Sequence, residues 1–449
     1  MNKKSMIRSS RATGTTSFVF GTIAALILAG TAQAGWHDRA DTVTIVNVKT
    51  TPRDDKTAIL SFDLSWGRSF RHEINHDAVW VFFKAKPQGA AEWRHVRLIA
   101  DKVLNPTGYT QGHGTPVEFI VPDGAEGFLG VFIRRAEFGQ GTVNATNLTV
   151  LCDLTTKELQ TTPPLICGTG LEMVYIPEGS FLLGLDAEDA DAFFQYTDGS
   201  RAGAPYRVSD PGAIPTGTQK GKLWAAGTAA PLEDGGEIPA AYPKGYAAFY
   251  CMKTMIKVGH YSNFIATVPK AQSAKYTKPR DGFTPLENAP GGNYSYQIGG
   301  RKEHHRHEIG GLSWPSVTGF AGWAGLRPMT ELEYEKLSRG PIDEGWETGN
   351  HKISHNSFWD IMDCNRWKSS CERIVTAGNA KGRNFKATHG NGTTDIPADW
   401  PQDDAIGAGT RGGYDFRNPS CRSAAAAPFV DASQKWRGVR NAPKEAAGQ

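Results

Sequence analysis

Cysteine is the residue type in this chain with the widest chemical repertoire, because its thiolate is both a nucleophile and a soft metal ligand. The 449 residues contain six of them: Cys152, Cys167, Cys251, Cys364, Cys371 and Cys421. No two show the C-x2-C spacing of a zinc ribbon, so they do not predict a structural zinc site. Arg417 and Arg422 stand close to Cys421 in the sequence. A guanidinium beside its sulfur would lower the pKa of the thiol and make it reactive, whereas a disulfide or burial would leave it inert.

The densest group of titratable side chains is at residues 301–308, which read Arg-Lys-Glu-His-His-Arg-His-Glu. Its imidazoles could bind a transition metal. Glycine pairs at 299–300 and 310–311 flank the group and also fit a solvated surface loop, which is the interpretation we favour. The chain has no H-E-x-x-H, G-x-S-x-G, Walker A or Rossmann pattern, so the usual hydrolase, metalloprotease and nucleotide sites are not indicated.

The start of the chain predicts export. Lys3, Lys4, Arg8 and Arg11 are followed by an apolar run at residues 18–30 and by a small-x-small cleavage site at residues 32–34. This is the layout of a signal peptide, which we place at residues 1–34. The run is shorter than the roughly 20 residues of a spanning helix. We therefore expect a mature chain without a transmembrane segment, in the periplasm, at the cell surface or secreted.

Composition and charge narrow the class of protein further. The formal net charge is only +3, and no basic run is interleaved with aromatic residues, so a nucleic-acid partner is not expected. An even number of cysteines in an exported chain favours disulfides. The short separations make Cys152 with Cys167, and Cys364 with Cys371, the candidate pairs, while the full connectivity stays open.

The elements that would position these residues begin with short strands. Alternating apolar and polar residues at 42–48, 58–64 and 117–121, and continuous apolar runs at 78–83 and 129–133, predict a β-sandwich over residues 41–150. We expect Trp66, Trp80 and Trp93 mainly in its core, although they could stack on a ligand. A linker is expected at residues 151–170, because prolines at 163 and 164 stiffen the chain there.

The remaining residues carry four ordered motifs. Residues 172–181 read Glu-Met-Val-Tyr-Ile-Pro-Glu-Gly-Ser-Phe, and a Phe-Tyr-Cys-Met-Lys segment at 249–253 leads to Phe264 and Ile265. Residues 325–335 read Gly-Leu-Arg-Pro-Met-Thr-Glu-Leu-Glu-Tyr-Glu, and Arg-Gly-Gly at 411–413 precedes Trp-Arg-Gly-Val-Arg at 436–440. In this order they resemble the formylglycine-generating-enzyme, or sulfatase-modifying-factor, family, over residues 171–442. The resemblance implies an α+β chain whose second part has an irregular C-type-lectin-like fold that binds calcium.

A helix start within the third motif can be predicted from the residues themselves. Thr330 can cap the helix, and Glu333 stands three residues later, which together predict a capping box. Arg339 and Gly340 then give a basic last turn and a glycine stop. We expect Glu331, Glu333 and Glu335 to serve the electrostatics of the helix start rather than catalysis.

The family's enzyme oxidises a substrate cysteine to formylglycine with copper, held by two cysteines spaced C-x4-C after its R-G-G-S motif. Soft thiolates suit Cu(I). Here Tyr414 takes the place of the motif's serine, Arg417 stands near the first ligand position, and Cys421 lies about one residue from the second. One thiolate makes a poor copper site, so the resemblance implies a fold without the family's chemistry. Tyr414, Arg417 and Arg422 are then candidate binding residues.

The family's calcium motif is also altered. Residues 360–367 read Asp-Ile-Met-Asp-Cys-Asn-Arg-Trp, which keeps an asparagine at Asn365 but replaces the motif's glycine with Cys364. A calcium site around Asn365 is a possible consequence of the resemblance.

Two functions from different classes follow. The first is a non-catalytic binding or structural component of the cell envelope, with a glycan or protein ligand. Aromatic or glycine-rich segments such as residues 293–296 and 389–392 would line its surface or form ordinary packed turns. The second is a formylglycine-generating oxidase that uses Cys421 and copper.

Overall fold

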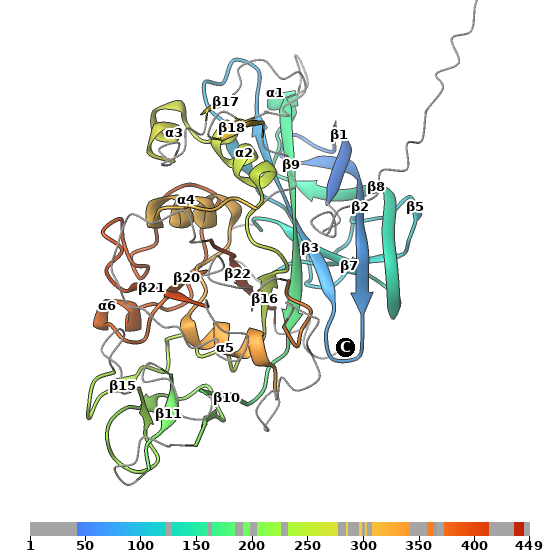
Figure 1. Ribbon diagram of the computed structural model, residues 1–449. Coiled ribbons are helices and arrows are strands. Elements are labelled where there is room, and N and C mark those ends of the chain that lie inside the picture. The colour runs from blue at the N-terminus through green and yellow to red at the C-terminus, as the bar shows by residue number, and fades with distance from the viewer. Residues whose placement is uncertain are drawn as a thin grey trace, which may run out of the picture. The chain divides into compact units, whose positions relative to one another are not determined.

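The computed structural model describes residues 43–122, 128–159, 164–184, 192–197, 204–225, 232–276, 284–285, 296–298, 301–302, 308–341, 357–362, 364, 372–412 and 435–443. The expected signal peptide lies outside these residues. They form an α+β structure made mainly of strands (Figure 1). Within them, no helix combines the length and the apolar character that crossing a membrane requires.

A first sheet of four strands has the order β1-β2-β8-β5. Its strands are β1 (Thr44–Pro52), β2 (Ala58–Arg71), β5 (His113–Gly114) and β8 (Gly139–Cys152). From Ala58 to Trp66, buried residues in β2 alternate with less buried ones, so one face of the sheet supplies a core and the other meets solvent. The alternation read from the sequence is confirmed here.

A second sheet of seven strands has the order β22-β16-β9-β3-β7-β6, with β4 paired to β3. Its strands are β3 (Asp77–Lys86), β4 (Arg94–Val96), β6 (Val117–Ile120), β7 (Val131–Arg135), β9 (Leu165–Ile176), β16 (Phe249–Met252) and β22 (Val439–Asn441). The two sheets share an apolar core to which β2, β8, β3 and β7 contribute. Figure 1 shows β2 and β8 on one side of β3 and β9, with helices α4 and α5 on the other.

Strand β3 contributes to two cores at once. Val79, Val81 and Phe83 point into the core between the sheets, whereas Ala78, Trp80 and Phe82 point into the core of the C-terminal part. Successive side chains on a strand point to opposite faces, so a strand that is buried on both faces needs an unbroken apolar run. The apolar run at residues 78–83 matches this burial. Trp66 and Trp80 are core residues as expected, whereas Trp93 is only partly buried and is not in the core.

Strand β9 joins the two parts of the chain through backbone hydrogen bonds. It pairs with β3 over the whole length of β3, from Asp77 opposite Val174 to Lys86 opposite Leu165. Its last residues also pair with β16, as Met252 lies opposite Met173. The expected linker at 151–170 is therefore wrong for residues 165–170, which are strand because β3 offers them a full row of backbone partners.

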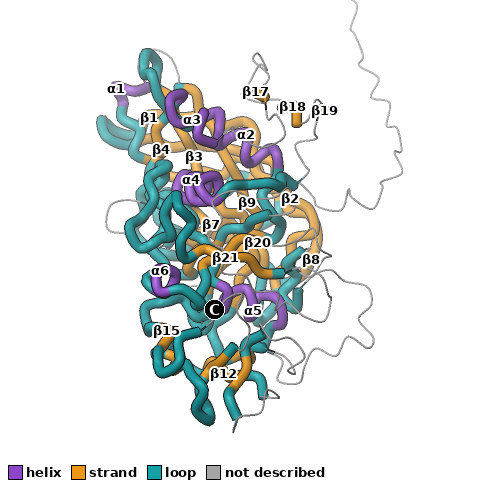
Figure 2. Tube along the Cα trace, turned by 60° about the vertical axis from the view of Figure 1, so that its left-hand side comes forward, coloured by secondary structure: helices purple, strands orange, loops and turns teal. Residues whose placement is uncertain are grey.

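Beyond β9 the chain is rich in loops (Figure 2). The helices are α1 (Thr156–Leu159), α2 (Val258–Thr267), α3 (Lys270–Tyr276), α4 (Trp314–Ala324), α5 (Glu331–Arg339) and α6 (Ala380–Arg383). Small sheets pair β10 (Phe181–Leu183) with β12 (Tyr206–Val208), β11 (Phe194–Gln195) with β14 (Leu223–Trp224), β13 (Ile214–Pro215) with β15 (Glu237–Ile238), and β20 (Glu372–Val375) with β21 (Ala408–Arg411). A further small sheet has the order β17 (Thr284–Pro285), β18 (Tyr296–Ile298) and β19 (Arg301–Lys302).

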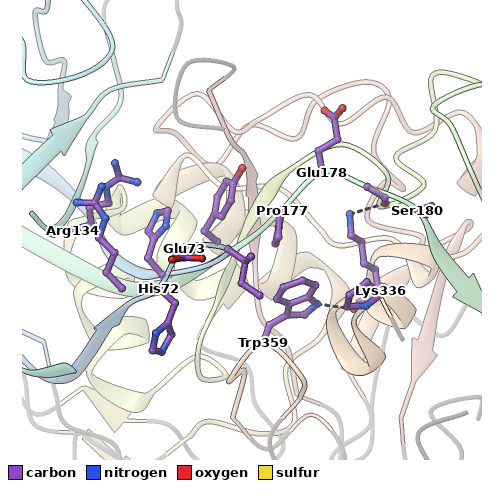
Figure 3. Close-up of a pocket in the computed structure, with 14 residues that line it drawn as sticks. His72, Glu73, Arg134, Pro177, Glu178, Ser180, Lys336 and Trp359 are labelled. Carbon is purple, nitrogen blue, oxygen red and sulfur yellow. Dashed lines mark hydrogen bonds between the residues drawn. The ribbon is translucent and has the colours of Figure 1, made fainter. Parts of the chain in front are cut away.

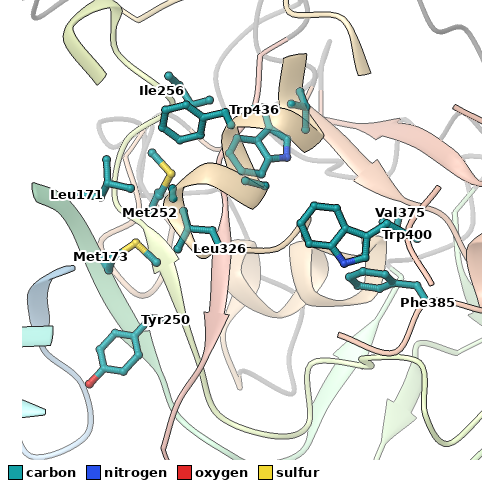
Figure 4. Packing of buried hydrophobic residues seen from close by; sticks show 14 of the residues in the cluster. Leu171, Met173, Tyr250, Met252, Ile256, Leu326, Val375, Phe385, Trp400 and Trp436 are labelled. Carbon is teal, nitrogen blue, oxygen red and sulfur yellow. The ribbon is translucent and has the colours of Figure 1, made fainter. Parts of the chain in front are cut away.

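The large core of this part packs helices and loops onto one face of the seven-stranded sheet. Leu171 and Met173 of β9, Tyr250 and Met252 of β16, and Leu326 belong to this core (Figure 4). Trp436, which belongs to the last motif identified in the sequence, is fully buried in this core. Trp436 thus anchors the last motif in the packed interior.

The predicted capping box at the start of α5 is confirmed. The Thr330 hydroxyl accepts a hydrogen bond from the Glu333 amide at 3.1 Å, and Glu333 Oε2 accepts one from the Thr330 amide at 3.0 Å. Helix-start electrostatics is only part of the role of these acids, because Glu331, Glu333 and Glu335 are all buried. Glu333 holds Arg327 through two hydrogen bonds of 2.9 and 2.6 Å.

A buried group of charges lies where β3, β9 and β16 come together. The ammonium of Lys253 is 2.8 Å from Glu172 Oε1 and 3.6 Å from Asp77 Oδ2, and it also lies 3.6 Å from Asp360 Oδ2, whose side chain is half exposed. Burial raises the pKa of Asp77 from 3.8 to about 7, although Lys253 opposes the rise. One cation therefore balances several acids at the junction of the two parts.

Candidate functional site

A cavity of about 370 Å³ opens at the end of the seven-stranded sheet where β3 begins. Its wall combines the turn between β2 and β3, the segment 177–180 after β9, the α5 residue Lys336, and Trp359 (Figure 3). Both parts of the chain supply residues, and the volume suits a small polar ligand. We take this cavity as the candidate site.

Neighbouring strands place three polar side chains in a row at the cavity. The strand order β9-β3-β7 puts Tyr175 of β9 beside His76, which directly precedes β3, and Arg134 of β7 on the other side. The Tyr175 amide donates to the His76 carbonyl at 2.9 Å. Arg71, the last residue of β2 in the first sheet, forms an isolated antiparallel β-bridge with His76 through the backbone. The rigid sheets therefore fix these side chains.

Arg71 and Arg134 share a single carboxylate oxygen. Glu118 Oε2 accepts from Arg71 Nη1 at 3.1 Å, from Arg134 Nε at 2.8 Å, and lies 2.7 Å from Arg134 Nη2. Arg71 Nη1 also donates to the carbonyls of Arg135 and Ala136. Within the described residues, Arg71 Nε and Nη2 and Arg134 Nη1 have no hydrogen-bond partner. These three nitrogens are free to bind a ligand.

His76 and Tyr175 form the aromatic part of the wall. Their rings stack at 4.9 Å with an interplanar angle of 10°, and His76 Nε2 lies 3.0 Å from the hydroxyl of Tyr250. Burial lowers the pKa of His76 well below 6.5, and Arg134 and Arg71 lower it further, so the imidazole is neutral at pH 7. Burial raises the pKa of Tyr175, which keeps its phenol protonated. The Tyr175 hydroxyl has no hydrogen-bond partner among the residues that the structure describes.

Lys336 and Trp359 form the opposite part of the wall. The Lys336 ammonium donates to the carbonyls of Gly179 at 3.2 Å and Tyr246 at 3.1 Å. Burial lowers its pKa to about 8, against the opposing effect of Glu333 and Glu178. The Trp359 indole donates to the Lys336 carbonyl at 3.1 Å. Figure 3 shows Lys336 and Trp359 close together, with Glu178 pointing away from them.

The site residues predicted from the sequence cannot be placed beside this cavity. Cys421, Arg417, Arg422, Tyr414 and Asn365 all lie outside the described residues. The copper and calcium expectations therefore stay predictions. Most of the histidine-rich segment 301–308 also lies outside them, and the described residues contain no group of acids, cysteines and histidines able to hold a metal ion.

The structure supports neither of the two predicted disulfides, Cys152 with Cys167 or Cys364 with Cys371. Cys152 and Cys167 are both free thiols, as are Cys251 and Cys364, whereas Cys371 and Cys421 lie outside the described residues. Cys152 instead donates from its sulfur to the Ala58 carbonyl at 3.5 Å. Burial raises the pKa of Cys152 and of Cys167 to about 11 and that of Cys364 to about 12. These thiols are therefore protonated at neutral pH.

The glycine-rich segment 389–392 is a packed turn. The amides of Gly390 and Gly392 donate to the carbonyls of Leu326 and Gly322 at 2.8 and 3.0 Å. A side chain at either glycine would collide with Gly322 or with the ring of His95. Of the two interpretations left open by the sequence, the structure supports packing here, while residues 293–295 lie outside the described part.

No family model, curated protein or solved structure matches this chain.

Sequence reasoning missed most of the cavity. Arg71, Arg134 and Lys336 are ordinary surface-type residues in their local sequence, and only the tertiary structure buries them together. Two signals in the sequence lie at the site: His72 and His76 between the apolar runs at 58–64 and 78–83, and the Pro-Glu-Gly stretch at 177–179 within the first motif. Neither signal shows that the two turns meet.

Proposed function

We propose that this chain is an exported, sulfatase-modifying-factor-like protein of the cell envelope that binds a glycan or protein ligand without catalysis. The ligand site in this proposal is the cavity at the start of β3. The proposal takes its family, its C-type-lectin-like fold and its export from the sequence motifs. It takes its binding site from the structure.

The observation that carries the proposal is the construction of the cavity wall. Turns from both parts of the chain project from two packed sheets and surround a space of about 370 Å³. Loops held on a rigid scaffold are the usual place for recognition. Side chains of Tyr175 and Trp359 offer flat apolar surface, and the rim residue Ile74 is 59% exposed. Polar and aromatic groups together suit a ligand with both ring faces and polar groups.

The proposal is tested by closing the cavity without disturbing the core. Ser180 is exposed and lines the cavity, so Ser180→Trp adds bulk at its mouth. A panel of bacterial and host glycans is titrated against the mature wild-type chain, and every ligand found is titrated against the variant. We expect Ser180→Trp to weaken binding at least tenfold. The matched control is Ala91→Trp, at an exposed position beyond the other end of β3, which should bind as the wild type does.

The oxidase alternative has a separate test. The mature chain is loaded with Cu(I), and oxygen uptake is followed with a cysteine-containing peptide. Our proposal predicts no uptake above that of free copper. Copper-dependent uptake that is lost in Cys421→Ser would overturn the non-catalytic part of the proposal.

A further inference from the structure

We propose that the cavity recognises an oxyanion, namely a carboxylate, sulfate or phosphate group carried on a sugar-sized ligand. This inference rests on the proposed function, because it names the chemistry of the ligand that the cavity takes. Three features of the wall carry it: an excess of buried positive charge, a set of donors that have no partner in the described chain, and the exposed position of the acids.

The inner wall, by which we mean the buried side chains that line the cavity on both sides, carries more positive than negative charge. Arg71 and Arg134 hold two positive charges against the one carboxylate of Glu118. Lys336 adds a third positive charge, and within the described residues its ammonium is bound by two carbonyls and by no carboxylate. Arg71, Arg134 and Lys336 are each at most 8% exposed, so water screens their charges poorly. A bound anion would balance this excess.

The inner wall also offers hydrogen-bond donors that the described part of the chain leaves unused. They are Arg71 Nε and Nη2, Arg134 Nη1 and the Tyr175 hydroxyl, in side chains that are each at least nine-tenths buried. These four atoms are not fully enclosed, so a ligand in the cavity that supplies acceptors can reach them and hydrogen-bond to them. Carboxylate, sulfate and phosphate each present several acceptor oxygens and match the planar fork of a guanidinium.

A neutral ligand fits this wall less well. Sugar hydroxyls both donate and accept, but the inner wall offers them mainly donors, and they bring no charge to offset the guanidinium groups. The neutral imidazole of His76 adds no positive charge of its own.

The acids of the cavity stand at its rim. Glu73 and Glu178 are exposed, and Figure 3 shows Glu178 pointing away from Lys336. Glu178 still acts on the inner wall, because its charge raises the pKa of Tyr175. These rim acids should weaken the binding of an anion. Removing one of them therefore tests the sign of the proposed interaction.

The experiment is isothermal titration of the mature chain at low ionic strength with D-glucuronate, D-glucose 6-sulfate, D-glucose 6-phosphate and D-glucose. The first three ligands share the glucose ring and carry an oxyanion at position 6, as a carboxylate in glucuronate and as an ester in the other two. The phosphate ester is titrated at pH 5 as well as pH 7, because it carries close to two charges at pH 7 and close to one at pH 5, and the ranking at equal charge identifies the preferred oxyanion. We expect at least one of them to bind tenfold or more tightly than glucose. Its affinity should fall as salt is added, because salt screens the attraction.

Two variants keep the test independent of folding defects. Tyr175→Phe removes only a hydroxyl that has no partner within the described chain, and should weaken the preferred acid roughly tenfold or more. Its matched control is Tyr109→Phe, which removes another unpartnered hydroxyl, in the core between the sheets, and should leave affinity unchanged. Glu178→Gln should tighten binding of the acid by roughly twofold to fivefold and leave glucose unaffected.

The outcomes separate the two proposals. If glycans bind in a Ser180-dependent way but none of the acids exceeds glucose, the oxyanion inference is overturned and the binding function stands. If an acid binds but is insensitive to Tyr175→Phe and Glu178→Gln, the inference is likewise overturned, since the anion then lies elsewhere. If no ligand of any class responds to Ser180→Trp, the proposed function fails.

Discussion

Arg437 and Glu372 form a two-pronged ion pair in which both side chains are fully buried. Arg437 Nε and Nη2 each lie 2.8 Å from a carboxylate oxygen of Glu372. The guanidinium also donates to the carbonyls of Met252, Lys253 and Met362 at 3.0 to 3.3 Å. One side chain thus ties the segment before β22 to β16, to β20 and to the loop at residue 362.

Neutralising one partner of this pair should destabilise the fold strongly. Glu372→Gln leaves the Arg437 charge buried and uncompensated, so we expect a loss of about 3–5 kcal/mol in the free energy of unfolding, measured by urea denaturation. The double variant Glu372→Leu with Arg437→Met should recover much of this loss. Lys275→Met, which breaks the exposed pair with Asp403, is the control and should cost at most about 1 kcal/mol. If Glu372→Gln lost less stability than the control, the Arg437–Glu372 pair would not be a major stabilising contact.

Removing the ammonium of Lys253 should produce a defect that grows with pH. In the folded state burial raises the pKa of Asp77 from 3.8 to about 7, so Asp77 favours folding at low pH and loses that contribution as pH rises to about 7. Lys253→Met removes the cation that opposes this effect. Unfolding free energies of wild type and variant at pH 5 and pH 8 should therefore differ more at pH 8. A difference independent of pH would show that the acids do not titrate with the lysine.

His76 should make the protein sensitive to mild acid. Its pKa is lowered in the folded state, mainly by burial, so below about pH 6.5 the unfolded chain binds a proton that the folded chain excludes. Stability from this group is complete above pH 6.5 and is lost as pH falls, by up to about 1.4 kcal/mol per pH unit. His76→Phe should flatten the profile of unfolding free energy between pH 7 and pH 5. The exposed residue His113 provides the control, because His113→Phe should leave the slope unchanged.

The four described cysteines should resist labelling in the native protein. Their pKa values are raised by burial, so little thiolate is present at pH 8. Iodoacetamide labelling followed by peptide mass spectrometry should find Cys152, Cys167, Cys251 and Cys364 unmodified in the folded state and modified after denaturation without reductant. A peptide joining Cys152 to Cys167 under non-reducing conditions would contradict the structure.

Local patterns in the sequence predicted the strands well. The unbroken apolar run at residues 78–83 and the alternation at 58–64 correspond to β3 and β2, because burial on two faces or on one imposes these periods. The capping box at Thr330 was equally predictable, since all its groups lie within one helical turn. Features set by neighbours within a few residues can be read directly.

Pairings between distant residues could not be read in this way. Cys167 of β9 pairs with Lys84 of β3, and this pairing depends on which strands become neighbours. Residues 165–170, which we expected in a linker, are therefore part of a sheet. The candidate cavity could not be predicted for the same reason. Arg71 and Tyr175 come together only when the two sheets and the turn after β9 have formed. Periodicity gives the faces of an element but not its partners.

The pairing of β9 also limits how the chain could be rearranged during evolution. A strand bonded on one edge to β3 and on the other to β16 belongs to both parts, so neither part can be exchanged as a cassette for an unrelated module. If the N-terminal part were moved to another protein without β9, the edge of β3 that β9 covers would be left without backbone partners. If β9 moved with it, β16 would lose its partner in the part left behind. We expect the two parts to be inherited together as a single unit.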